Sequence, residues 1–123
     1  MADTNVSQEF LDQFASDPEG IVWIALIQLQ RDNRIDRFQY QIPFGQAEIK
    51  GYVRVDFEVM VAPTLWPLEV FGVYYHDELD PDDQLRLVRL QQEYNVDHVA
   101  IVWEPDAVDV ETAYNKIVDE LRL

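Results

Sequence analysis

The chain of 123 residues is 48% hydrophobic and carries a formal net charge of −15, which predicts one folded domain over 1–123 with a single core. It contains no cysteine, so disulfides and thiolate metal sites are excluded. No stretch reaches the roughly 20 apolar residues that span a membrane, and the beginning of the chain shows no basic-then-apolar export signal. We therefore expect a soluble, cytoplasmic protein without membrane partners.

The charge comes from 24 acidic against 9 basic residues. Such an imbalance repels phosphate backbones at long range and argues against general nucleic-acid binding. It does not exclude a nuclease, because a site that gathers divalent cations is itself built from carboxylates. A high-salt habitat or a surface that imitates DNA would give the same charge, so both alternatives stay open.

Two helices are predicted in the first quarter of the chain. Phe10, Leu11 and Phe14 share one helical stripe, which predicts a short lead-in helix over 7–14. Ser16 can cap a second helix, and Pro18 suits its first turn. Apolar residues continue this second helix to about residue 30.

Three strands follow. Hydrophobic residues alternate with polar ones over 37–43 and again over 53–61, where valines and Phe57 occupy one face and Asp56 lies on the other. A polar turn is predicted at 45–51 and a tight connection at 62–67, after which 68–75 forms the third strand. Connections this short predict an antiparallel meander.

The rest of the chain predicts a helix, a strand and a helix. The first of these helices begins near residue 80, ends at Asn95, and has an apolar stripe made of Leu85, Leu87, Val88, Leu90 and Tyr94. Residues 98–103 are almost entirely apolar, which is typical of a central buried strand, and we expect this strand beside the third one. A last helix is predicted over 110–121. The fold class is thus α/β, in the order α-β-β-β-α-β-α, with a mixed sheet flanked by helices.

Other polar and aromatic residues have structural interpretations. His98 opens the apolar strand and is expected to be hydrogen-bonded rather than a ligand, while Trp66 and Trp103 are expected to pack. No serine stands in a strand-turn-helix elbow, and the four glycines form no phosphate-binding loop.

Asp56 and Glu69 each interrupt a strand that is otherwise apolar. Neighbouring antiparallel strands joined by a short turn bring such positions within reach of each other, and two adjacent carboxylates repel. A divalent cation between them removes this repulsion, and Mg²⁺ is commonly held by one or two carboxylates. The alternative is a solvated sheet face, with both acids beside Arg54 and Glu58.

The motifs around these acids resemble those of the PD-(D/E)xK nuclease superfamily. They are the run Val55-Asp56-Phe57, the segment PLEVFGVYYH over 67–76, and then Asp83 and Arg86 in the following helix. Within the superfamily, the chain is most similar to the small single-domain branch akin to very-short-patch-repair endonucleases. The resemblance covers 16–121 and implies a restriction-endonuclease-like core.

The resemblance also implies a set of site residues. Asp56 and Glu69 match the two metal ligands, the carbonyl of Val70 a third, and Glu19 an acid that completes the site. His76 matches a position that assists the attacking water. The implied cofactor is Mg²⁺, which would activate water and stabilise charge on the scissile phosphate.

One position departs from the family pattern. The family's lysine stands two residues after the acid, where this chain has Phe71, which can neither orient water nor neutralise a phosphate. Arg54 and Lys50 are the candidates for a base from a neighbouring strand. Catalysis and its loss both stay open at this point.

Three functions are consistent with these observations. The first is a metal-dependent DNA endonuclease, encoded, as the resemblance suggests, by a phage or mobile element and located in the host cytoplasm or virion. The second is a catalytically inactive nuclease fold that serves as a virion, assembly or protein-interaction component, with proteins rather than DNA as partners. The third, resting on charge alone, is an acidic DNA mimic. The oligomeric state is left open.

Overall fold

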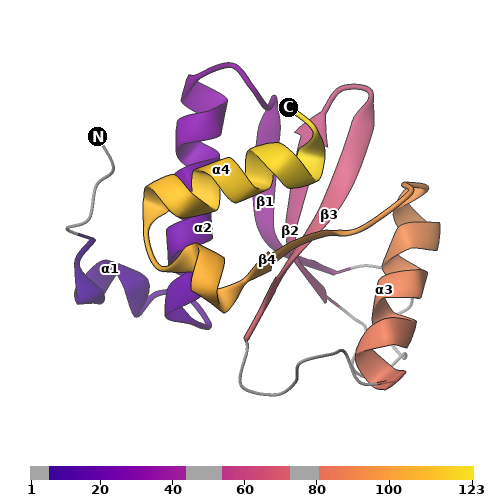
Figure 1. The fold of residues 1–123 in the computed structure, drawn as a ribbon, viewed down its shortest axis with the longest axis horizontal. Coiled ribbons are helices and arrows are strands. Elements are labelled where there is room, and N and C mark those ends of the chain that lie inside the picture. The colour runs from indigo at the N-terminus through magenta and orange to yellow at the C-terminus, as the bar shows by residue number, and fades with distance from the viewer. Residues whose placement is uncertain (1–5, 44–53, 73–80) are drawn as a thin grey trace.

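The computed structural model describes residues 6–43, 54–72 and 81–123. A short first helix leads into the order of helices and strands that the sequence predicts (Figure 1). The elements are α1 (Gln8–Leu11), α2 (Asp17–Arg31), β1 (Arg37–Pro43), β2 (Arg54–Val61), β3 (Thr64–Phe71), α3 (Pro81–Tyr94), β4 (Ala100–Trp103), the 3₁₀ helix η1 (Glu104–Ala107) and α4 (Val110–Leu121). The predicted turn at 45–51 lies outside the described residues.

The described strands form one mixed sheet in the order β1-β2-β3-β4. β1, β2 and β3 pair antiparallel, which confirms the meander, and β4 pairs parallel with β3 as expected. The prediction that β4 is a central strand is wrong, because it lies at the edge of the described sheet. Its residues are apolar because α4 covers them: Ala100 and Val102 are buried in one cluster with Ile117 of α4. In addition, Glu120 Oε1 of α4 accepts a hydrogen bond from the Ile101 N–H of β4 at 2.9 Å.

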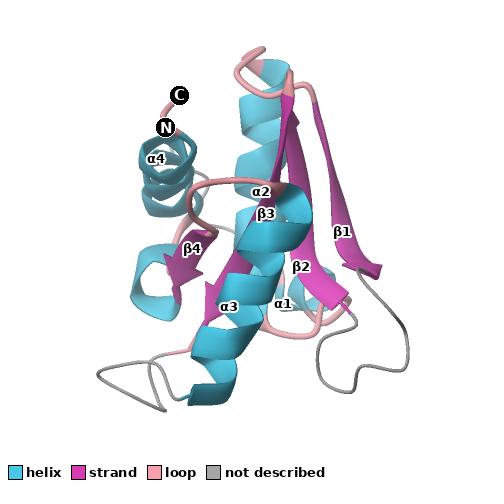
Figure 2. Ribbon diagram, turned by 90° about the vertical axis from the view of Figure 1, so that its right-hand side faces the viewer, coloured by secondary structure: helices cyan, strands magenta, loops and turns pink. Residues whose placement is uncertain are grey.

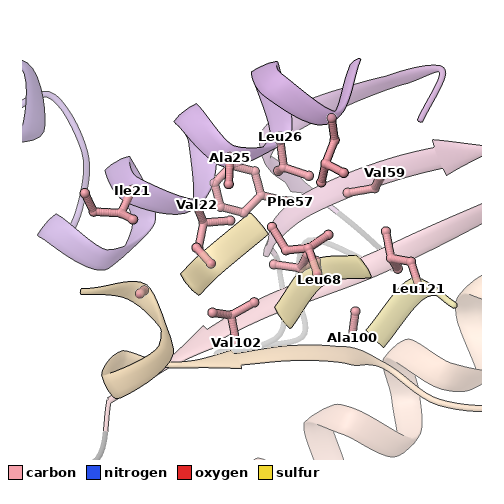
Figure 3. Close-up of a cluster of buried hydrophobic side chains, with 14 of the residues drawn as sticks. Ile21, Val22, Ala25, Leu26, Phe57, Val59, Leu68, Ala100, Val102 and Leu121 are labelled. Carbon is pink, nitrogen blue, oxygen red and sulfur yellow. The ribbon is translucent and has the colours of Figure 1, made fainter. Parts of the chain in front are cut away.

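The main core lies between α2, α4 and one face of the sheet. Figure 3 shows the α2 side chains directed at the strands, with residues of β4 and α4 closing the layer. Among its buried members are Val22, Ala25, Leu26, Phe57, Val59, Leu68, Ala100, Val102, Ile117 and Leu121. A second, smaller cluster joins Val55 and Val99 to Leu90 of α3. Helices therefore flank both faces of the sheet (Figure 2).

Local signals place the helix ends. Ser16 caps α2 as predicted: its hydroxyl accepts the Glu19 N–H at 3.4 Å and donates to Glu19 Oε2 at 2.9 Å. α3 ends before Asn95, which has a φ of 55°, the left-handed conformation that asparagine tolerates. α1 is shorter than the predicted 7–14. It packs closely on α2, because a Cβ at Gly20 would lie 2.6 Å from Leu11 Cδ2.

The third strand begins four residues earlier than predicted. The predicted connection at 62–67 is mostly strand, because Thr64, Leu65, Trp66 and Pro67 pair with residues 61 to 58 of β2. Only Ala62 and Pro63 form the turn. Proline and the turn-like composition concealed this pairing, which is decided by β2 rather than by local sequence.

The predicted apolar stripe of α3 is partly wrong. Leu90 is buried, and Leu87 and Tyr94 pack against the same cluster, but Leu85 and Val88 are 51% and 48% exposed. The helix rests on the sheet along one narrow line of residues, so side chains on its other flank face outward.

His98 is hydrogen-bonded as expected. Its Nδ1 lies 2.7 Å from a carboxylate oxygen of Asp97, and its Nε2 lies 2.7 Å from the backbone carbonyl oxygen of Glu120.

Candidate active site

β2 and β3 separate at Asp56 and Glu69, the two acids identified from the sequence. The strands pair as far as Phe57 and Leu68. Beyond that point, among the described residues, β2 pairs with β1 and β3 pairs with β4, so the two strands diverge (Figure 2). Asp56 and Glu69 are the next residue on each strand after the last pair. We call this place the strand fork.

Side chains replace the missing ladder at the strand fork. The Asp56 N–H donates to Glu69 Oε2 at 2.8 Å, and the Val70 N–H donates to Asp56 Oδ2 at 2.8 Å. Each carboxylate is thus held by the backbone of the opposite strand. The sequence-based expectation that the two acids come within reach of each other is confirmed, although they do so where the sheet opens rather than across a regular ladder.

The alternation of faces in β2 breaks at Asp56. Val55 packs with the α3 cluster, whereas Phe57 packs in the main core, although a regular strand places residues two apart on one face. On β1, Tyr40 pairs with Phe57 and Ile42 with Val55, and Gln41 between them has a φ of 54°. The predicted common face for Val55 and Phe57 is therefore wrong, because the backbone is distorted beside Asp56.

The cation of the site comes from α3. Arg86 Nε–H donates to Glu69 Oε1 at 2.6 Å, and the two side chains are 18% and 2% exposed. The bases considered from the sequence, Lys50 and the side chain of Arg54, lie outside the described residues. The sequence identified Arg86 as part of the family resemblance but assigned it no role. Its helical spacing was a signal for this contact, since Arg86 precedes the buried Leu90 by one turn and shares its face of α3.

The surroundings of the strand fork raise the pKa of both carboxyls. Burial, followed by the charge of Glu69, raises the pKa of Asp56 from 3.8 to about 8, while the Val70 N–H and Arg86 oppose the rise. Burial also raises the pKa of Glu69, against the hydrogen bond from Arg86. Carboxyls perturbed by burial and by a specific partner are a feature of functional sites.

Glu19 lies close to this group but has its own partners. It is 8% exposed, and besides Ser16 it binds the Tyr40 hydroxyl, which donates to Oε1 at 2.7 Å. That hydroxyl accepts the Ala15 N–H at 3.0 Å. Burial and Glu19 raise the pKa of Tyr40 to about 12. The charge of Glu19 contributes to the raised pKa of Asp56, so the residue acts on the site electrostatically.

The donor chemistry of the strand fork fits a hard divalent cation. Mg²⁺ is usually bound by one or two carboxylates, with waters and phosphate oxygens in the other positions, and Asp56 with Glu69 form such a pair. Within the described residues, no three acidic or histidine side chains are grouped to hold a metal ion, and the expectation that Glu19 completes the site remains a prediction. The role of the Val70 carbonyl stays a prediction, and His76 lies outside the described residues.

Phe71 stands where the resemblance expects a lysine, and it packs with another aromatic residue. Its ring lies 5.4 Å from that of Trp103, centroid to centroid, in an edge-on arrangement. The two residues are register partners across β3 and β4. Phe71 therefore belongs to the β3–β4 packing.

In the described part of the chain, no helix is long and apolar enough to cross a membrane. No family model, curated protein or solved structure matches the chain.

Proposed function

We propose that this protein is a metal-dependent nuclease with a restriction-endonuclease-like core, which hydrolyses DNA phosphodiesters at the strand fork. One observation carries the proposal: Asp56 and Glu69 are held side by side where β2 and β3 diverge, and both pKa values are raised. The order of elements around the mixed sheet is consistent with the resemblance to PD-(D/E)xK nucleases.

Each residue of the site has a distinct part in this proposal. A divalent ion held by Asp56 and Glu69 would supply Lewis-acid stabilisation of the phosphate charge and an activated water. The N–H groups of Asp56 and Val70 keep the two carboxylates in place. Asp56 must lose its proton to bind a cation, so ion binding strengthens as the pH approaches about 8.

A second candidate is a nuclease-like fold without catalysis that serves as an interaction component. Two observations favour it: Arg86 neutralises Glu69, and Phe71 packs on Trp103. In that case the same contacts only hold the strand fork and α3 together. The two candidates differ in whether the carboxylates bind a divalent ion.

Calorimetric titration with Mg²⁺ and with Mn²⁺, followed by a plasmid-nicking assay with the same ions, tests the proposal. The variants are Asp56→Asn and Glu69→Gln, which preserve shape while removing charge, and Asp119→Asn on the exposed side of α4 is the matched control. Binding and nicking by the wild type and the control, with loss in both site variants, would support the nuclease. Binding without nicking would contradict the proposed hydrolysis of DNA but keep the metal site. No metal-dependent heat would refute the metal site and leave the non-catalytic candidate.

A further inference from the structure

Each carboxylate oxygen of Glu69 already accepts a hydrogen bond before any metal arrives. Its Oε2 accepts the Asp56 N–H at 2.8 Å, and its Oε1 accepts Arg86 Nε–H at 2.6 Å. The side chain of Glu69 is 2% exposed, whereas that of Arg86 is 18% exposed. An ion approaching Glu69 from solvent therefore competes with the Arg86 guanidinium for the carboxylate.

We propose that the Arg86 guanidinium occupies the cation position of the strand fork and is a built-in counterion that a divalent ion displaces from Glu69. This inference rests on the proposed metal site and adds a regulatory contact to it. Both cations bind the same carboxylate, and two positive charges in a poorly solvated place repel. Binding of the divalent ion and pairing of Arg86 with Glu69 are consequently antagonistic.

The geometry makes Arg86 the partner that moves. Glu69 is fixed by a backbone N–H from β2 and by its place in β3. Arg86 reaches it along a flexible side chain from a separate element, α3. A displaced guanidinium stays close to the strand fork, where phosphate is a suitable ligand because guanidinium groups bind phosphate oxygens in paired hydrogen bonds.

α3 has attachments that do not depend on Arg86. Leu90 is buried against Val55 and Val99, with Leu87 packed beside it, and the Tyr94 hydroxyl donates to Glu58 Oε2 of β2. Removing the guanidinium should therefore leave the helix docked. A variant at Arg86 consequently reports on competition for Glu69.

The test compares Mg²⁺ and Mn²⁺ affinities of Arg86→Met, Arg86→Lys and the wild type by calorimetry, with folding verified by circular dichroism. Arg89→Met is the matched control, because it removes the same charge from α3 one turn further on. We expect Arg86→Met to bind at least about fivefold more tightly than the wild type, the lower end of usual coupling between two ligands. Arg86→Lys, which keeps a cation, should stay near the wild type, and so should the control. Equal or weaker binding by a folded Arg86→Met protein would overturn the proposal.

An NMR measurement on the wild type keeps the proposal testable if Arg86→Met does not fold. The Arg86 Nε–H signal, assigned with Arg86→Lys, should shift when Mg²⁺ saturates the site, and an unchanged signal at saturation would overturn the displacement. If the wild type binds no metal but Arg86→Met does, Arg86 is a permanent substitute for the ion: the proposed nuclease fails and the counterion assignment stands. If neither protein binds metal, both proposals fail.

Discussion

Replacing Asp56 by Asn should make the protein more stable in alkaline solution and leave it nearly unchanged in acid. The folded chain holds the Asp56 proton with a pKa of about 8, against an ordinary value of 3.8. Between these values the unfolded chain releases the proton while the folded chain retains it. Stability contributed by this group is therefore lost as the pH rises from about 4 to about 8, and the loss levels off above the folded pKa.

The magnitude follows from the same values. A rise of about four pKa units corresponds to an upper limit of about 5.5 kcal/mol, at about 1.4 kcal/mol for each unit. The pH range of the measurement excludes the part of this loss that occurs below pH 5. The loss is reduced further because the titration of Asp56 is coupled to that of Glu69. We therefore expect the stability to fall by about 2–3 kcal/mol between pH 5 and pH 8.5. The Asn side chain keeps an oxygen for the Val70 N–H and does not ionise.

Urea unfolding at pH 5, 6.5 and 8.5, followed by the fluorescence of the three tryptophans, measures the effect. The stability of the wild type relative to Asp56→Asn should fall by about 2–3 kcal/mol across this range. Asp119→Asn, which alters an exposed acid, should show no such trend. A difference between wild type and Asp56→Asn that stays constant with pH would refute the buried, protonated Asp56 and with it the electrostatics of the strand fork.

The other predictions concern stability measured by the same urea unfolding at pH 7. Glu69→Ala should cost about 3 kcal/mol, because it leaves the partly buried Arg86 without this carboxylate; a loss below about 1 kcal/mol would contradict the pair. Gly20→Ala should cost about 1–3 kcal/mol, since the new Cβ meets an α1 side chain at 2.6 Å, and an unchanged stability would contradict that packing. Leu90→Ala should cost about 2–5 kcal/mol and Leu85→Ala less than about 0.5 kcal/mol, because only Leu90 is buried. Equal costs would show that α3 docks by another face.

The sequence by itself determined the order of the helices and strands and the pair of acids. The signals for these elements are local: the cap at Ser16, the left-handed residue Asn95 at the end of α3, and the hydrophobic periodicities of helices and strands. They can therefore be recognised without knowledge of the tertiary packing. Asp56 and Glu69 stood out because a charged residue inside an apolar strand requires a partner or a function. The bounds of β1 and α4 follow the same local patterns and agree with the structure.

Only the tertiary structure decided how these elements meet. At the strand fork β3 stops pairing with β2 after Leu68 and continues beside β4 on its other edge, a contact between segments more than thirty residues apart. The choice of Arg86 as the cation depends on how α3 docks on the sheet, and the same docking exposes Leu85 and buries Leu90. Register and helix docking are set by the summed packing of distant side chains, so no short stretch of sequence contains them.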